Sequence, residues 1–242
     1  MQDTELDPVL SETLQKAGRH MPTLVIANKN YSSWSMRPWL ALKWAGIAFE
    51  EQVRQIGAGP GYGMQRAPHI LAVSPSGRVP VLHADGYTVH DSLAICEWAH
   101  EQAGNLWPAD PAARALARSI AAEIHSGYMG LRRELGMNLK RRMDAPPALS
   151  EDVQRDLERL FAAWEDARAR FAADGPFLFG ARSIADAMYA PVATRLRTYA
   201  VPAPPAARDY CAAIFSDPAF QEWERDALAE TWTMPSVDGL FA

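Results

Sequence analysis

Short apolar runs and turn signals dominate the first hundred residues. Residues 23–27 read Thr-Leu-Val-Ile-Ala, a β-branched run typical of a buried strand. A helix that holds Pro38 in its first turn and stops at Gly46 is expected next, and another begins at Asp91 or Ser92. The expected strands cover residues 23–27, 47–53, 79–82 and 87–89. The order β-α-β then β-β-α predicts an α+β domain with a mixed four-stranded sheet and helices beside it.

The remainder of the chain has only helical spacing. Apolar residues from Leu116 to Leu139 recur every three or four positions and predict one long helix. After Pro146-Pro147 a second series follows a cap at Ser150, and shorter helices are expected at 183–199, 205–215 and 218–230. We therefore expect an all-α C-terminal helical bundle. The predicted organisation is an N-terminal extension (1–20), a first domain (21–102), a linker (103–108) and the helical domain (109–242).

Composition narrows the class of protein. Hydrophobic residues make up 48% of the 242 residues and the formal net charge is -5, so no basic footprint for nucleic acid or an anionic membrane is present. Cys96 and Cys211 lie far apart and form no CxxC pair, which argues against a disulfide framework or a metal site. We find neither a signal sequence nor an apolar run of about 18 residues, and expect a cytoplasmic protein.

A serine-rich loop precedes the first helix. Ser32, Ser33 and Ser35 stand where the N–H groups and the positive end of a helix dipole stabilise an anion. A hydroxyl there could donate a hydrogen bond to a bound thiolate and so lower the pKa of that thiol from its reference value of about 8.5. The alternative is that these serines only cap the helix, which is the usual role of such residues.

Two further segments could hold a ligand with a peptide backbone. Val79-Pro80 opens a strand, so either the strand is an edge strand or the peptide bond is cis, which would leave the polar groups of Val79 free for an extended ligand. Asp91-Ser92 opens a helix, where N–H groups and a hydroxyl suit a carboxylate and Asp91 suits an ammonium. An ordinary strand start and a simple helix cap are the respective alternatives.

The order of these segments resembles the glutathione transferase superfamily over about residues 22–232. Ser32-Ser33-Trp34-Ser35-Met36-Arg37 resembles the serine motif of the zeta class, and less closely that of theta. Residues 78–82 resemble the family's cis-proline strand, residues 90–95 its acidic-Ser segment, and residues 177–186 the helix-capping box of its second domain. The resemblance implies a thioredoxin-like first domain and a homodimer.

The resemblance also implies roles for individual residues. Ser32 would stabilise the thiolate of glutathione, with Ser33 as the second candidate. Val79 would pair with the cysteinyl backbone, beside Pro80, while Asp91 and Ser92 would hold the γ-glutamyl end. Arg78 stands where zeta enzymes commonly carry glutamine. The residues proposed to bind the second substrate are Trp34, Tyr128, Met129, Arg132 and Arg133.

Departures from the zeta pattern keep several functions open. Trp34 replaces the zeta cysteine, which argues against thiol–disulfide exchange, and Arg195 and Arg197 flank the position of the zeta arginine that binds a substrate carboxylate. We expect an enzyme, a glutathione S-transferase of the detoxification type, with glutathione as co-substrate, no metal and a small electrophilic substrate. A glutathione-dependent isomerase of the maleylacetoacetate type and a non-catalytic glutathione-binding scaffold are the alternatives.

Overall fold

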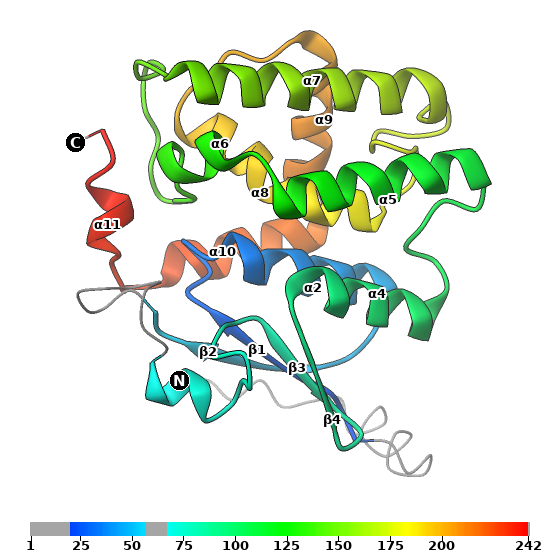
Figure 1. Ribbon diagram of the computed structural model, residues 1–242, viewed down its shortest axis with the longest axis vertical. Coiled ribbons are helices and arrows are strands. Elements are labelled where there is room, and N and C mark those ends of the chain that lie inside the picture. Colours follow the sequence, from blue (N-terminus) through cyan, green and yellow to red (C-terminus); the bar gives the residue numbers. More distant parts are fainter. Residues whose placement is uncertain (1–19, 57–66, 242) are drawn as a thin grey trace.

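The computed structural model describes residues 20–56 and 67–241 (Figure 1). A sheet forms one side of the molecule, helices α2 (Ser33–Ala45) and α4 (Ser92–Ala103) cover one face of it, and most helices of the second part of the chain are layered above these two (Figure 1). Residues 57–66 and residues 1–19 of the expected N-terminal extension lie outside the described residues.

The mixed four-stranded sheet is confirmed. Its strands are β1 (Thr23–Ala27), β2 (Glu50–Arg54), β3 (Val81–Ala84) and β4 (Tyr87–His90), in the order β2-β1-β3-β4. Strand β1 runs parallel to β2 and antiparallel to β3, and β3 pairs antiparallel with β4. Strand β2 starts at Glu50, later than the expected residue 47, because the strand is an exposed edge and needs no apolar run.

Three helices accompany the sheet: α2 (Ser33–Ala45), α3 (Pro68–Leu71) and α4 (Ser92–Ala103). The expectation that Pro38 lies in the first turn is wrong, because α2 already begins at Ser33 and Pro38 lies inside the helix. The serine loop is therefore partly the first turn of α2 itself. Gly46 ends the helix in the left-handed region (φ 70°), as expected of a glycine there.

The second part of the chain is helical, as expected. Its helices are α5 (Pro111–Ser126), α6 (Met129–Glu134), α7 (Glu151–Phe171), α8 (Ile184–Thr198), α9 (Pro205–Ser216), α10 (Pro218–Ala229) and α11 (Pro235–Asp238). The single long helix expected from Leu116 to Leu139 is wrong. Tyr128 adopts a left-handed conformation (φ 56°) after Gly127, and this ends the regular hydrogen bonding between α5 and α6. The apolar period continues across the break because both segments bury one face.

Helix α8 is held at its start by a complete capping box. The Asp186 carboxylate accepts from the Ser183 N–H at 2.8 Å and from the Leu178 N–H at 3.1 Å. Burial raises the pKa of Asp186 to about 6 despite these hydrogen bonds. The box fixes where α8 enters the core, as the sequence predicts.

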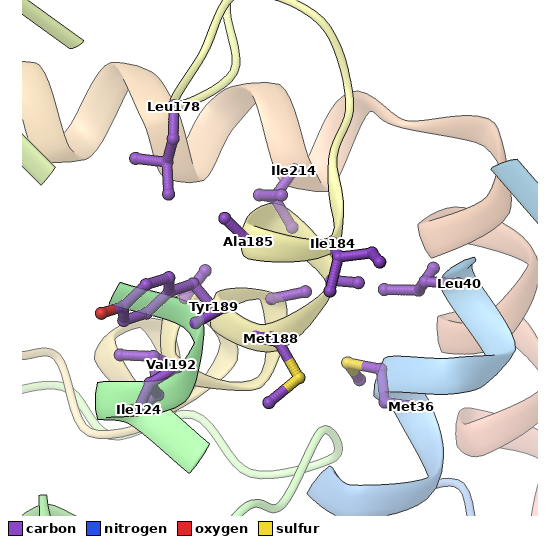
Figure 2. Close-up of a cluster of buried hydrophobic side chains, with 14 of the residues drawn as sticks. Met36, Leu40, Ile124, Leu178, Ile184, Ala185, Met188, Tyr189, Val192 and Ile214 are labelled. Atoms are coloured by element: carbon purple, nitrogen blue, oxygen red, sulfur yellow. The ribbon is translucent and has the colours of Figure 1, made fainter. Parts of the chain in front are cut away.

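The two parts of the fold share one core. Figure 2 shows Met36 and Leu40 pointing from α2 toward Ile184 and Met188 of α8, and all four side chains are fully buried. Helices α2 and α8 therefore pack directly against each other across the junction of the sheet domain and the helical domain. This packing also brings side chains of α8 next to the first turn of α2, which holds the serine motif.

The chain before α2 is anchored by the C-terminal helices. The ammonium of Lys29 lies between the rings of Trp39 and Trp223, at 5.2 and 5.4 Å from their centroids, and pairs with Glu51 at 2.8 Å. The Glu230 carboxylate accepts from the backbone N–H of Lys29 at 2.6 Å and from that of residue 30 at 3.0 Å. These contacts hold the loop that leads into the serine motif.

Candidate active site at the start of α2

The three serines differ in what their hydroxyls do. The Ser32 hydroxyl donates to Ser35 Oγ at 2.8 Å and accepts from the Ser35 N–H at 3.3 Å, which makes Ser32 the N-cap of α2. Ser35 Oγ also accepts from the Ala27 N–H at 3.0 Å, so this hydroxyl ties the helix to β1. Ser33 Oγ instead accepts from Arg195 Nη2 at 3.1 Å, across the α2–α8 junction. The Ser33 proton is therefore available to a further acceptor.

Arginine side chains surround this first turn. Arg37 follows Ser33 by one helical turn, and its guanidinium lies 4.4 Å from the ring of Trp34. Arg132 of α6 lies 4.7 Å from the same ring and donates to the last carbonyls of α5, including Gly127 O at 2.8 Å. The ring of His125 meets Trp34 edge-on at 5.4 Å. Trp34 is thus framed by cationic side chains from both parts of the fold.

The peptide bond between Val79 and Pro80 is cis, and β3 lies inside the sheet. Of the two alternatives raised by the sequence, the cis bond is confirmed and the edge strand is wrong. Within residues 20–56 and 67–241 the N–H and C=O of Val79 make no backbone hydrogen bond. Val79 is half-buried and Arg78 is exposed. A free donor and acceptor at the sheet end suit a ligand with an extended backbone.

Asp91 is the N-cap of α4 and adopts a positive φ of 83°. One carboxylate oxygen accepts from the Leu93 N–H at 2.8 Å, and the other lies 3.3 Å from His125 Nε2. The Oγ of Ser92 is buried and has no hydrogen-bond partner among the described residues. Because a buried hydroxyl without a partner is costly, Ser92 fits a ligand that supplies one.

Burial shifts the pKa values of the ionisable groups around Trp34. Desolvation lowers the pKa of His125, although Asp91 opposes this effect. Desolvation also lowers the pKa of Arg132 and brings that of Arg195 to about 9. Each of these shifts has the sign that burial of a cation produces. The charges of neighbouring arginines also lower the pKa of His125 and that of Arg195, so a further positive charge is disfavoured here.

The residues proposed for the second substrate are placed differently from one another. Trp34 and Arg132 lie together beside Arg37, and Trp34 is 37% exposed. Tyr128 is buried, and its hydroxyl has no partner within the described part of the chain. Met129 is 63% exposed, and Arg133 pairs with Glu134 and Asp152 near the start of α7. The structure thus brings two of the five to the first turn of α2.

Arg37 stands in the quoted serine motif, but no role was assigned to it, and His125 belongs to none of the sequence motifs. Besides this motif, the spacing of four between Ser33 and Arg37 is a signal, because it places both on the same helix face. No comparable signal exists for His125, which reaches the site from the last turn of α5. Arg195 is marked in the sequence only as a neighbour of the zeta arginine position, yet it contacts Ser33.

The described residues include neither a cluster of metal-ligand side chains nor a helix that could span a membrane. In residues 20–56 and 67–241 no group of three or more His, Cys, Asp or Glu side chains is arranged to hold a metal ion. Among the helices of this part of the chain, none combines the length and apolar character needed to span a membrane.

Comparison with known proteins identifies the family. The family models of the glutathione S-transferase N-terminal and C-terminal domains match residues 31–102 and 147–213. The rat protein maleylacetoacetate isomerase is 36% identical over 112 residues, which span 46% of this chain and 50% of that protein. A glutathione S-transferase of Pseudomonas putida is 32% identical over 162 residues, covering 62% of this chain and 64% of that protein.

Solved structures extend the similarity over more of the chain. A glutathione transferase homologue from Burkholderia, solved with bound glutathione, is 26% identical with a TM-score of 0.66, and the match covers 87% of this chain and 100% of that one. The maleylacetoacetate isomerase of Anaeromyxobacter dehalogenans shares the fold at 23% identity, with a TM-score of 0.61 over 88% of this chain and 94% of that one. The segment matched in the curated mammalian relatives spans about half their length. With both domain models matched in their proper order along one sheet-plus-helix fold, this chain belongs to the glutathione S-transferase family.

Proposed function

We propose that this protein binds reduced glutathione across the start of α4 and the cis Val79-Pro80 segment, with the thiol at the first turn of α2. The observation that carries the proposal is the buried Ser92 Oγ, which has no hydrogen-bond partner among residues 20–56 and 67–241, at a helix start that also presents the Asp91 carboxylate. Ser92 and the α4 N–H groups would hold the γ-glutamyl carboxylate, and Asp91 the ammonium. Val79 would pair with the cysteinyl backbone, beside Pro80 and Arg78.

The chemistry we propose is attack by the thiolate on an electrophilic carbon. Hydrogen bonds from Ser32 or Ser33 favour the charged sulfur, and the α2 N-terminus adds to the effect. A sulfur–carbon bond forms while a leaving group departs with its electron pair, or a carbanion takes up a proton. Ser33 is favoured as the donor because Arg195 donates to its oxygen and leaves its proton free, whereas the Ser32 proton is engaged with Ser35.

Three related proposals complete this assignment. We propose that the chain divides at a linker over 103–108 into a glutathione-binding domain (21–102) and a helical domain (109–242). We further propose that the protein acts as a homodimer in the cytoplasm on small electrophiles, in a detoxification role, without nucleic-acid or membrane partners. Glutathione would be the co-substrate, with no metal taking part.

A second candidate function is glutathione-dependent isomerisation. It is favoured by the segment of the rat protein maleylacetoacetate isomerase that is 36% identical to this chain. In that reaction glutathione would add and then leave, so it would be regenerated. A non-catalytic glutathione-binding scaffold would show binding without either reaction. Whether glutathione is consumed, regenerated or merely bound separates these functions.

The test is a titration of bound glutathione by ultraviolet thiolate absorbance. We compare the wild-type protein with Ser32→Ala and Ser33→Ala, using S-methylglutathione as a control ligand that cannot ionise. A thiol pKa at least about one unit below the free value of about 8.5 supports the proposal, and one such unit corresponds to about 1.4 kcal/mol. Loss of this shift in one serine variant identifies the donor. An unshifted thiol pKa in the wild type, or no glutathione binding, would refute the proposal.

A further inference from the structure

One contact joins the start of α4 to the end of α5. His125 Nε2, in the last turn of α5, lies 3.3 Å from Asp91 Oδ2. The other oxygen of this carboxylate accepts from the N–H groups of Leu93 at 2.8 Å and Ala94 at 3.3 Å. The side chains of Asp91 and His125 are 46% and 25% exposed, so a ligand can reach both. Oδ2 is therefore the oxygen of Asp91 that a ligand would share with His125.

The surroundings of the His125 ring favour its neutral form. The ring packs edge-on against Trp34, with ring centroids 5.4 Å apart. Its Nδ1 is buried and finds no hydrogen-bond partner in the described ranges 20–56 and 67–241. A neutral ring can leave Nδ1 unprotonated, whereas the imidazolium has an N–H at both nitrogens. Protonation would therefore add a buried N–H, as well as a charge, where those ranges offer no acceptor.

The charged groups that act on this ring come from three elements. Asp91 at the start of α4 favours the imidazolium, while Arg37 of α2 and Arg132 of α6 disfavour it. Desolvation by burial has the largest influence, and the pKa of His125 is lowered from its usual 6.5. The ring is thus largely neutral at about pH 7 and becomes charged when the solution is acidified.

A ligand ammonium and the imidazolium of His125 would compete for one carboxylate. The proposed function places the ammonium of the γ-glutamyl end on Asp91, whose Oδ1 is already engaged with the N–H groups of α4. When His125 is neutral, the charge of Asp91 is available to the ammonium. When His125 is protonated, it pairs with Asp91 and repels the second cation.

We propose that His125 makes glutathione binding sensitive to pH, because the neutral ring leaves Asp91 to the ammonium and the protonated ring competes for it. The inference rests on the proposed function, since it needs the ammonium at Asp91. It gives His125 a positioning role that is exerted through Asp91 rather than on the thiol. Linkage is reciprocal, so bound glutathione must make His125 harder to protonate by the same factor by which protonation weakens binding.

Nuclear magnetic resonance measures this reciprocity. The imidazole signal of His125, assigned by its loss in His125→Gln, is titrated with and without saturating S-methylglutathione, which carries the ammonium but no ionisable thiol. The pKa of His125 should fall on binding. A deaminated S-methylglutathione, which keeps both carboxylates and lacks the ammonium, should leave this pKa unchanged or raise it, because the ligand then brings only negative charge to the site.

Calorimetry measures the corresponding affinities. Titrations are made about one pH unit above and about one pH unit below the measured pKa of His125. S-methylglutathione should bind wild-type protein at least about threefold more weakly at the lower pH, since two like charges about 4 Å apart repel each other by a factor of about five even in bulk water. The deaminated analogue should show no such loss of affinity.

Two variants and one control test whether His125 causes the effect. His125→Gln and His125→Asn keep a polar side chain that does not titrate, so the affinity of each for S-methylglutathione should change less than about 1.5-fold between the two pH values. His83→Gln removes a histidine of β3 that lies 3.2 Å from Thr88 Oγ1 of β4, and should keep the wild-type pH dependence. Circular dichroism identifies a variant that does not fold, and the comparison of the two ligands on wild-type protein is decisive without any variant.

The outcomes separate this inference from the proposed function. If S-methylglutathione binds but its affinity does not fall at the lower pH, or falls equally in His125→Gln and His125→Asn, the role of His125 is overturned while the proposed function stands. An equal loss for the deaminated analogue would also overturn it, because the competition would not involve the ammonium. If S-methylglutathione binds at neither pH, the proposed function fails, and this inference fails with it.

Discussion

Removal of the Asp186 carboxylate should destabilise the protein, and by an amount that depends on pH. In Asp186→Ala the N–H groups of Ser183 and Leu178 lose their acceptor at a fully buried position. Each orphaned buried donor costs about 1–3 kcal/mol, so the lost hydrogen bonds amount to about 4 kcal/mol. The variant also removes a carboxylate that burial makes costly, and this second effect opposes the first.

The pKa of Asp186 sets the size of the opposing effect. Burial raises that pKa from 3.8 to about 6. A carboxyl with a higher pKa in the folded chain binds more protons when folded, so its contribution to folding stability falls as pH rises from 3.8 through about 6. At about 1.4 kcal/mol per pH unit, the full loss is about 3 kcal/mol, of which about 2 kcal/mol falls between about pH 4.5 and about pH 7.5.

Urea unfolding at these two pH values measures the difference. The penalty of Asp186→Ala should be about 3 kcal/mol at about pH 4.5 and about 1 kcal/mol at about pH 7.5. Asp110→Ala is the control, because Asp110 caps α5 at an exposed end through one bond to the Ala113 N–H at 2.7 Å and should cost about 1 kcal/mol. If Asp186→Ala lost more unfolding free energy at the higher pH than at the lower, the reasoning would be refuted. The hydrogen bonds to the carboxylate would then outweigh the cost of its burial.

Three further predictions concern other parts of the fold. Gly130→Ala should lower stability by about 2 kcal/mol, because its Cβ would lie 2.9 Å from the backbone of α7, and an unchanged or higher Tm would contradict this. Glu230→Gln leaves one acceptor for the two N–H groups of residues 29 and 30. The free energy of unfolding measured in urea should fall by about 1–2 kcal/mol, and calorimetry should show a weaker affinity for glutathione. Wild-type values of both quantities would disprove the anchoring role. Burial raises the pKa of Cys96 and brings that of Cys211 to about 12, so Ellman's reagent should label neither thiol in the native protein and both in guanidinium, and rapid native labelling would show that they are accessible.

The sequence alone determined the elements whose signals are local. The β-branched run at β1, the Ser150 cap of α7 and the Ser183–Asp186 box of α8 depend on neighbours within a few residues, and each appears where expected. The motif order was sufficient to identify the family, because three weak local signals at fixed spacing are seldom found together. The apolar spacing wrongly predicted one continuous helix through Tyr128. The spacing continues there because both segments bury one face, but the backbone of Tyr128 is not helical.

Tertiary structure decided which polar groups meet and which remain without partners. The sequence predicted the helix starts and the serines. Which of Ser32 and Ser33 has a free hydroxyl proton depends on Arg195, a residue 162 positions away from Ser33. Arg37 likewise looks like an ordinary helical arginine until the packing of α2 against α8 buries it. The physical reason is that burial and charge balance are properties of the assembled junction. The sequence of one segment does not specify which distant side chains will surround it.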